Sequence, residues 1–426
     1  MTSRGEAPVR VLMSEGSSLS ARESLTALGR AGYEVEVVDA NPLCLARFSK
    51  YCRRLHIGPR FGLDPEGYLE RVISILADAR FDVLFPAHEQ AFLFARFSGR
   101  LSELTHLALP SFDTFLRLQS KVGFAGVLRE LALPSPPTVV ARDEIALRAA
   151  ARQLPVYIKT AFGTASHGLF CIRSADDLER AIESVRAYLS EGVVVQELIQ
   201  GPLERMQAVF DTGCMVGFHA NRQVVEGVSG GDLVKESVPA LLAREHIERI
   251  GRHLMWHGGL SIDYILDRRG EPNYIDSNPR LAETGNALAV GLNLPELLVR
   301  ISLREKLTEC RIDTTGVCSF MGIQALLRAA RDTGSRWQVV RNLADLVLRR
   351  GVFANGTEEL TPLRSDALAL IPLAAVAGAL IIKPSFWKRL ASATVDAYAA
   401  TPLVVQFATG ARLHAPLPTF RRGTAD

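Results

Sequence analysis

Three oxygen-bearing side chains in the second half of the chain have the spacing of a metal site. Residues 260–280 form two alternating runs around a turn signal, a pattern that predicts a β-hairpin. A two-residue turn at residues 269–270 would pair Asp263 with Asp276 and bring their Cβ atoms to about 5 Å. Asn278 would share their face of the sheet, because side chains alternate along a strand. Facing carboxylates repel unless a cation lies between them, and such hard oxygen ligands suit Mg²⁺.

Two alternatives remain open for this hairpin. A slip of one residue in the pairing would place the two acids on opposite faces, as separate solvated charges. Arg280 follows Asn278 by two residues. It would either stabilise an anionic intermediate beside the metal or cap the next helix.

A lysine followed by a short-chained loop forms the second candidate site. Lys159 ends a predicted strand, and the loop at residues 160–168 contains Gly163, Ser166 and Gly168. Backbone N–H groups and hydroxyls of such a loop can approach phosphate oxygens while the lysine supplies a positive charge. The order differs from a P-loop, in which the lysine follows the glycines. The alternative is a solvated lysine at the end of a strand.

Alternating strands and helices before residue 110 predict a small parallel α/β domain. Its first turn holds one glycine, Gly16, where a dinucleotide fingerprint needs three, which disfavours nucleotide binding there. The predicted strands are residues 9–13, 34–39 and 82–85, and the predicted helices are residues 21–30 and 65–78.

The segment LPSPPT at residues 133–138 favours extended backbone and marks the start of a new α/β unit. A helix over residues 111–131 is predicted before it. The strands predicted after it are residues 138–141, 156–159, 169–172 and 193–196, with helices at 143–153 and 175–189. Antiparallel strands are predicted at residues 206–211, 215–220, 261–266 and 273–277, with a helix at 239–255.

Composition is typical of a folded globular protein with two or three domains. The 426 residues are 48% hydrophobic and 22% charged, and the net charge is +3. Long basic runs are missing from the sequence, so nucleic acid is not an expected partner. The six cysteines show no CxxC spacing, and the N-terminal residues lack an apolar signal stretch. These features predict reduced thiols and a cytoplasmic location.

The most apolar stretch is residues 367–382, which carry no charge. A helix of that length spans about 24 Å, short of the roughly 30 Å hydrocarbon core of a membrane. A buried helix or two short core elements are therefore favoured. An interfacial segment, anchored by Trp387, Lys388 and Arg389, is the next alternative, and a true membrane span is the least favoured.

In combination these residues resemble the ATP-grasp superfamily, in particular the carboxylate–amine ligases that are similar to the carbamoyl phosphate synthase large subunit. The resemblance spans about residues 9–305 and is specific because the motifs occur in a fixed order. These are Lys121, Lys159, VVVQELIQGPLE at residues 193–204, GGD at residues 230–232, Asp263, and DSNPR at residues 276–280.

The resemblance implies a mixed α/β and α+β fold with three parts. A Rossmann-like pre-ATP-grasp domain would span residues 1–110. A two-lobed ATP-grasp domain would follow at residues 111–305, with lobes at about 111–196 and 197–305. Residues 306–426, including the apolar segment 367–382, would form a C-terminal extension.

The resemblance also implies roles for individual residues. Lys121 and Lys159 would contact the phosphates of ATP, together with the loop that contains Gly163, Ser166 and Gly168. Glu197 and Ile199 would border the adenine, and Glu204 would hold the ribose. Asp263, Asp276 and Asn278 would bind Mg²⁺ or Mn²⁺, and Arg280 would steady an acyl phosphate. Asp276 departs from the commoner glutamate and is one methylene shorter, which shifts the metal geometry.

The implied reaction is the ATP-dependent joining of a small carboxylate to an amine. The carboxylate would take the γ-phosphate of MgATP to give an acyl phosphate, and the amine would then displace phosphate. One alternative is a carboxylate or carbamate kinase-like subunit. Another is a nucleotide-binding adaptor without turnover that contacts a membrane through residues 367–389. A homodimer is a further expectation.

Overall fold

The N-terminal part forms a parallel sheet because buried strands alternate with helices that cover them. The computed structural model describes residues 7–164, 167–228, 230–363 and 365–410. In spatial order the strands are β3 (Cys52–Ile57), β2 (Glu34–Asp39), β1 (Arg10–Met13) and β4 (Val83–Phe85). The helices are α1 (Leu19–Arg30), η1 (Leu45–Phe48), α2 (Pro65–Asp78), α3 (Gln90–Arg96) and α4 (Ser98–Ser102). The predicted parallel α/β arrangement is confirmed, and β3 is an addition that the sequence pattern did not indicate.

Two helices connect this part to the next, where one helix over residues 111–131 was expected. They are α5 (Phe112–Gln119) and α6 (Lys121–Glu130). Ser120 interrupts them because its backbone is extended and its side chain accepts a hydrogen bond from the N–H of Gly123, as an N-cap. The backbone N–H of Lys121 donates to the carbonyl of Ala161 at 2.8 Å, which ties the start of α6 to the loop after Lys159.

A second, antiparallel sheet carries Lys159. Its strands, in spatial order, are β5 (Thr138–Ala141), β8 (Val193–Glu197), β6 (Val156–Thr160) and β7 (Leu169–Ile172). The helices of this unit are α7 (Glu144–Ala150), α8 (Ala175–Val185) and η2 (Arg186–Tyr188). Their apolar residues, such as Ile158 and Ile182, form a separate small core, so this lobe has its own packing.

The third sheet is the largest and carries the predicted metal hairpin. In spatial order its strands are β13 (Pro272–Asn278), β12 (Gly258–Leu266), β9 (Leu203–Asp211), β10 (Cys214–Glu226), β11 (Asp232–Ser237), β14 (Cys318–Phe320) and β15 (Thr357–Glu358). The helices of this part are α9 (Leu241–His253), α10 (Gly285–Ala289) and α11 (Leu294–Ser302). Because β14 and β15 belong to this sheet, the sheet continues past the predicted domain border at residue 305.

Helices dominate the remaining C-terminal residues. They are α12 (Gly322–Thr333), α13 (Arg336–Val347), η3 (Gly351–Phe353), η4 (Ala367–Ala369), α14 (Leu370–Ile382), η5 (Pro384–Phe386), α15 (Trp387–Tyr398) and α16 (Pro402–Thr409). The apolar segment 367–382 forms η4 and α14, and Pro372 is tolerated because it lies in the first turn. In the part of the chain that the structure describes, no helix is both long and apolar enough to span a bilayer.

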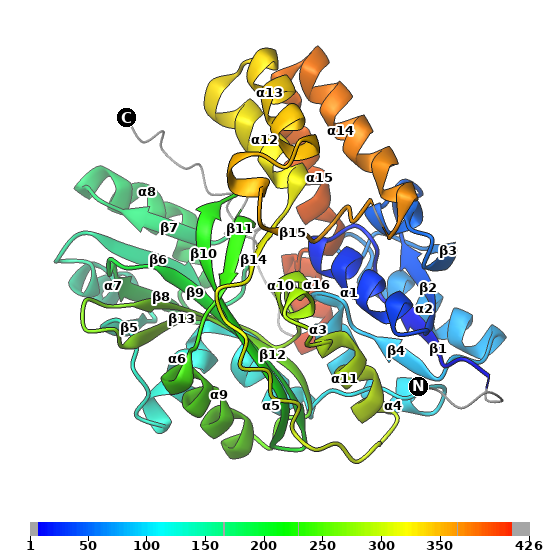
Figure 1. Cartoon of the computed structure of the whole chain (residues 1–426). Coiled ribbons are helices and arrows are strands. Elements are labelled where there is room, and N and C mark those ends of the chain that lie inside the picture. Colours follow the sequence, from blue (N-terminus) through cyan, green and yellow to red (C-terminus); the bar gives the residue numbers. More distant parts are fainter. Residues whose placement is uncertain (1–6, 165–166, 229, 364, 411–426) are drawn as a thin grey trace.

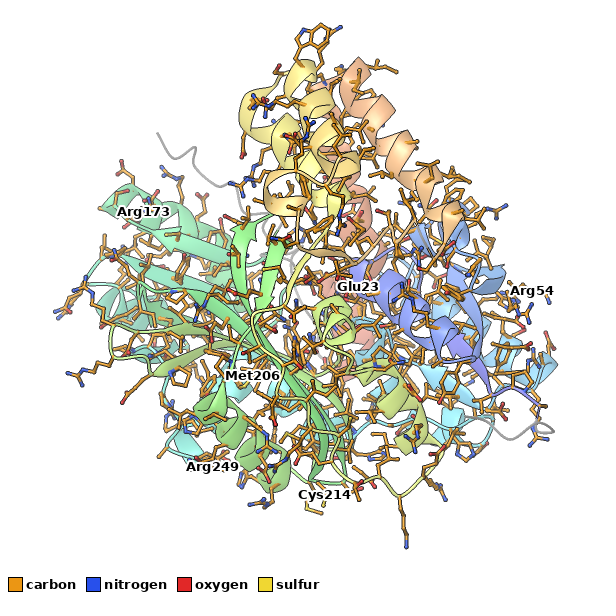
Figure 2. All side chains as sticks on the ribbon, in the orientation of Figure 1. Glu23, Arg54, Arg173, Met206, Cys214 and Arg249 are labelled. Carbon is orange, nitrogen blue, oxygen red and sulfur yellow. The ribbon has the colours of Figure 1, made fainter. Side chains whose placement is uncertain are left out.

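The long strands of the third sheet lie at the centre of the molecule (Figure 1). Figure 1 shows the N-terminal sheet and the sheet of β5 to β8 on opposite sides of the long strands β9, β10 and β12, with α12, α13 and α14 at one end. Met206 of β9 lies in the middle of the molecule, whereas Arg54 and Arg173 lie at its rim (Figure 2). Side chains that project from the central strands can therefore meet residues from every other part.

A cluster of buried charges joins α1 to the central sheet. Lys235 is 1% exposed, and its Nζ lies 2.8 Å from Glu359 and 3.1 Å from Glu283. Burial opposes the charge on this lysine, but the carboxylates more than compensate and raise its pKa. Glu23 of α1 belongs to the same electrostatic cluster, and burial raises its pKa well above the usual value. Glu23 is 1% exposed, and Figure 2 labels it on α1.

Replacing Lys235 with methionine is expected to lower the free energy of unfolding by about 3–5 kcal/mol, because buried carboxylates would lose their cation. Chemical denaturation of the purified variant measures this loss. Lys306→Met, at an exposed position, is the control and is expected to change stability by less than about 0.5 kcal/mol. Equal stability of the two variants would contradict the assigned role of Lys235.

Candidate functional site

The hairpin of β12 and β13 brings the predicted metal ligands together. Asp263 pairs with Asp276, and Ser261 pairs with Asn278, so the predicted pairing of the two acids is confirmed. The predicted two-residue turn is wrong. The strands are joined by residues 267–271, where Asp267 Oδ1 accepts hydrogen bonds from the backbone N–H groups of later turn residues.

A β-bulge explains how the pairing survives the longer turn. Next to the turn, Leu266 pairs with Pro272 and Tyr264 with Tyr274, a register one residue away from the expected one. The register shifts between Tyr264 and Asp263, which restores the expected alignment at the two acids. The side chains of Asp263 and Asp276 therefore project on the same face.

Protein cations neutralise the two facing carboxylates. Lys121 Nζ lies 2.6 Å from Asp276 Oδ1, and Arg205 Nε lies 3.4 Å from Asp263 Oδ1. Burial opposes the charge of Asp276, but Lys121 and Lys159 outweigh it and lower its pKa. Burial raises the pKa of Asp263 to about 6, with partial compensation by Arg205. Both carboxylates are thus mainly ionised at pH 7.

The donor set at this position fits a hard divalent cation. Among the described residues, no three His, Cys, Asp or Glu side chains converge in a way that could hold a metal. The hairpin instead offers two carboxylates and the amide of Asn278, whose Oδ1 accepts a hydrogen bond from Arg280 Nη2 at 3.2 Å. Mg²⁺ and Mn²⁺ accept such a set when phosphate and water oxygens complete the octahedron.

Lys159 is a buried residue of β6 that contacts the same hairpin. It is 7% exposed, and its Nζ donates to Gln196 Oε1 at 2.8 Å and to the carbonyl of Ile275 at 2.7 Å. Burial lowers the pKa of Lys159 to about 8. The carbonyl of Ile275 holds this ammonium group beside the neighbouring Asp276, so the lysine is not a solvated strand end.

The conformation of the loop after Lys159 requires glycine at two positions. Gly168 has a φ of +74° and its carbonyl accepts the N–H of Thr160, and a Cβ added to Gly163 would lie 2.1 Å from the carbonyl oxygen of His167. Gly163 lines the cavity described below. Ser166, the third residue predicted to contact phosphate here, lies outside the described residues.

The residues predicted to contact the adenosine are not among those that line the cavity around Asp263 and Asp276. Glu197 is exposed at the end of β8, and Ile199 is half-buried in the following segment. Glu204 is 2% exposed and accepts a hydrogen bond from Tyr264 at 2.8 Å while pairing with Arg222. Strand alternation turns Glu204 away from the face that carries Asp263, and its role at the ribose stays a prediction.

Arg280 is buried beside the metal hairpin and does not cap a helix. Its Nη2 donates to Glu89 Oε1 at 3.0 Å, and both side chains are less than 10% exposed. Sequence reasoning missed Glu89 because it comes from the N-terminal part, far away in sequence. It also missed Arg205, which strand alternation on β9 and pairing opposite Asp263 would have indicated.

A single cavity of about 710 Å³ connects these groups. Its size is within the usual range of small-molecule sites. Apolar side chains of Leu169, Leu203 and Ile275 line it near Lys159. Residues of the N-terminal part and of α12, α14 and α15 form other walls. Its lining includes the charged residues discussed above, which are Lys121, Lys159, Arg205, Asp263, Asp276 and Arg280.

Comparison with known proteins identifies sequence relatives. No family model matches the chain. The carbamoyl phosphate synthase large chain of Methanospirillum hungatei is 24% identical over 328 residues, which cover 72% of this chain and 30% of that protein. The chain thus spans less than a third of the length of the curated relatives that it matches there.

Solved structures share the fold. The biotin carboxylase domain of Hydrogenobacter thermophilus 2-oxoglutarate carboxylase has a TM-score of 0.60 at 17% identity, covering 74% of this chain and 73% of that one. The ADP complex of an N5-carboxyaminoimidazole ribonucleotide synthetase has a TM-score of 0.60 at 15% identity, covering 88% and 98%. An L-amino acid ligase from Bacillus licheniformis has a TM-score of 0.54 at 17% identity, covering 71% and 76%.

These likenesses agree with the resemblance that the ordered motifs indicate. The chain is similar in sequence to carbamoyl phosphate synthase large chains and shares the fold of the biotin carboxylase domain and of the N5-carboxyaminoimidazole ribonucleotide synthetase. Its mixed α/β fold is confirmed. The assignment of residues 1–110 as a pre-ATP-grasp domain stays a prediction.

Proposed function

We propose that the protein is an ATP-dependent carboxylate–amine ligase that forms an amide bond through an acyl phosphate and releases ADP and phosphate. One observation carries the proposal: Asp263, Asp276 and Asn278 share one face beside Lys159 and Arg280 in a single cavity. A pure nucleotide binder has no need for an arginine beside the metal ligands, whereas transfer to a carboxylate does.

MgATP fits the part of the cavity between the second and third sheets. Leu169, Leu203 and Ile275 provide apolar walls for the adenine. The triphosphate would then extend toward Lys159 and Lys121, whose ammonium groups offset its charge. A ribose contact by Glu204 requires this side chain to leave Tyr264, and the adenine contacts of Glu197 and Ile199 are proposals of the same kind.

The residues of the site account for phosphoryl transfer without a protein nucleophile. Asp263, Asp276 and Asn278 would hold Mg²⁺, which supplies charge neutralisation between the phosphates when it is bound. Lys159 stabilises charge on the transferring group, and Arg280 orients the attacking carboxylate and steadies the acyl phosphate. The loop at residues 160–168 would cover the phosphates and exclude water.

The similar proteins support this reaction class. They include an L-amino acid ligase and a 2-oxoglutarate carboxylase domain in complex with MgADP and bicarbonate. Both names are consistent with ATP-dependent chemistry at a carboxylate.

Steady-state ADP release tests the proposal. We expect ADP release that requires both a carboxylic acid and an amine. Release with acid alone would instead support the kinase-like alternative. Binding of nucleotide without turnover, together with sedimentation on lipid vesicles, would support the membrane adaptor.

Location and assembly stay predictions. The cytoplasmic location, the membrane contact through residues 367–389 and the homodimer are testable by fractionation, vesicle sedimentation and size-exclusion chromatography. The biotin carboxylase domain of 2-oxoglutarate carboxylase is described as a dimer, which supports the test for a homodimer.

Affinity for Mg-nucleotide is expected to fall as the pH rises through 8. The pKa of Lys159 is about 8, and its protonated form is the one that attracts phosphate, so binding weakens by up to about tenfold per pH unit above that value. Titration of Mg-AMP-PNP between pH 7 and 9.5 measures the effect. Lys159→Arg is the control and should remove the pH dependence, because a guanidinium stays charged. If the affinity of Lys159→Arg for Mg-AMP-PNP fell equally with rising pH, the role of Lys159 would be contradicted.

A further inference from the structure

The same cavity has an apolar half that phosphoryl transfer does not use. Among the described residues, η1, α12, α14 and α15 contribute no charged side chain to its lining. The lining there includes Phe48, Leu327, Ile371, Val376 and Leu390, together with Leu43 before η1. Ile371 is 48% exposed and Leu43 is 67% exposed. Burying these surfaces against an apolar ligand would be favourable.

Two unpartnered polar atoms lie in the polar half of the cavity. Arg280 Nε and His88 Nδ1 are buried and have no hydrogen-bond partner among the described residues. Both residues are 7% exposed and line the cavity. The nearest acid to His88 is Glu89, at 3.8 Å, which exceeds a hydrogen bond. An unpaired buried N–H is costly, so Arg280 Nε, and His88 Nδ1 in the tautomer that carries its proton there, would both be satisfied by a ligand with acceptor oxygens, such as a carboxylate.

Helix α15 connects the two halves. Tyr398 at its end stacks on His88, with ring centroids 3.6 Å apart. The cavity-lining residues of this helix recur on one face, which runs about 12 Å from Tyr398 back to Leu390 at a rise of 1.5 Å per residue. They are Leu390, Ala391, Ala393, Thr394, Val395 and Tyr398. A ligand that starts at His88 and follows this face passes from polar to apolar surroundings.

We propose that the carboxylate substrate is amphipathic: its carboxylate is received by Arg280 Nε and by the Nδ1–H tautomer of His88, and its aliphatic tail lies against α14 and α15. This inference rests on the proposed ligase function, because Arg280 also hydrogen-bonds the metal-site residue Asn278. It adds the class of acid: a monocarboxylic acid with an extended apolar group.

A series of straight-chain acids tests the tail site. Acetate, butyrate, hexanoate and octanoate are titrated into the full chain with Mg-AMP-PNP present, and heat of binding is measured. Affinity is expected to rise roughly fourfold per added methylene, the value that follows from the burial of one CH₂ group. Equal affinity for acetate and octanoate would overturn the proposal.

Two neighbouring alanines of α14 provide a matched pair of variants. Ala375 lines the cavity and Ala374 does not, although both are exposed. Ala375→Phe is expected to weaken octanoate binding by roughly tenfold or more, the equivalent of about two methylenes, with acetate and AMP-PNP unchanged. Ala374→Phe is expected to change none of the three. Equal effects of the two variants, or none, would overturn the placement of the tail.

The nucleotide titration separates this inference from the function on which it rests. If AMP-PNP binds and the acid series is flat, the amphipathic substrate is wrong while the ligase proposal stands. If AMP-PNP does not bind and the acid series still rises, the nucleotide site is wrong while an apolar acid site remains.

Discussion

The variant Asp276→Asn is expected to lose ADP release by about 10³-fold, the scale on which removal of one preorganised charge-stabilising group acts. The substitution keeps the size of the side chain but removes one of the two carboxylates that we propose hold the cation of the nucleotide. Lys121 and Lys159 hold the pKa of Asp276 below its usual value, so the wild-type group is ionised at neutral pH. Steady-state ADP release measures the loss.

The fold should survive this substitution. Asparagine can still accept a hydrogen bond from Lys121, so the melting temperature without Mg²⁺ or nucleotide is expected to change little. Asp78→Asn, at an exposed position near the end of α2, is the control and should leave ADP release unchanged. A variant of Asp276 that retains turnover while folded would remove this residue from the metal site.

Arg280→Lys is expected to lower kcat by about 10²-fold with little change in AMP-PNP affinity. Lysine keeps a positive charge beside the buried Glu89, which protects the fold, but it loses Nε and the planar fork that receive a carboxylate. The split between kcat and nucleotide affinity is the informative readout, since it separates a contact to the acid from a contact to ATP.

The matched control for this arginine is Arg269→Lys in the exposed turn of the hairpin. It should leave both kcat and nucleotide affinity unchanged. Weakened AMP-PNP binding in Arg280→Lys, with kcat preserved, would assign Arg280 to the nucleotide and contradict its role beside the acyl phosphate.

The sequence was sufficient to predict the hairpin of the candidate metal site, although the predicted turn was wrong. The pairing of Asp263 with Asp276 depends on strand alternation, which is a local property. The turn at residues 267–271 depends on Asp267 accepting backbone hydrogen bonds, and the bulge beside Asp263 depends on the neighbouring strand. The longer turn moves the pairing by one residue and the bulge moves it back, so Asp263 still pairs with Asp276.

Other parts of the site were beyond sequence reasoning because they depend on tertiary contacts. The resemblance implies a ribose contact by Glu204, and the sequence did not indicate that Tyr264 and Arg222 hold this side chain on the far face of β9. Glu89 reaches Arg280 from the N-terminal part of the chain. The apolar wall of α14 and α15 closes a cavity to which Lys159, Asp263 and Arg280 contribute from much earlier in the sequence, which no local pattern indicates.

The central claim is that Asp263, Asp276 and Asn278 hold a divalent cation against a nucleotide triphosphate. A crystal structure with AMP-PNP and Mn²⁺, read from anomalous density, tests it most directly. The account predicts a manganese ion coordinated by an oxygen of each of the three side chains, with Lys121 and Arg205 shifted toward phosphate or other acids. Manganese bound elsewhere, with Lys121 still on Asp276 and a nucleotide in the cavity, would contradict it.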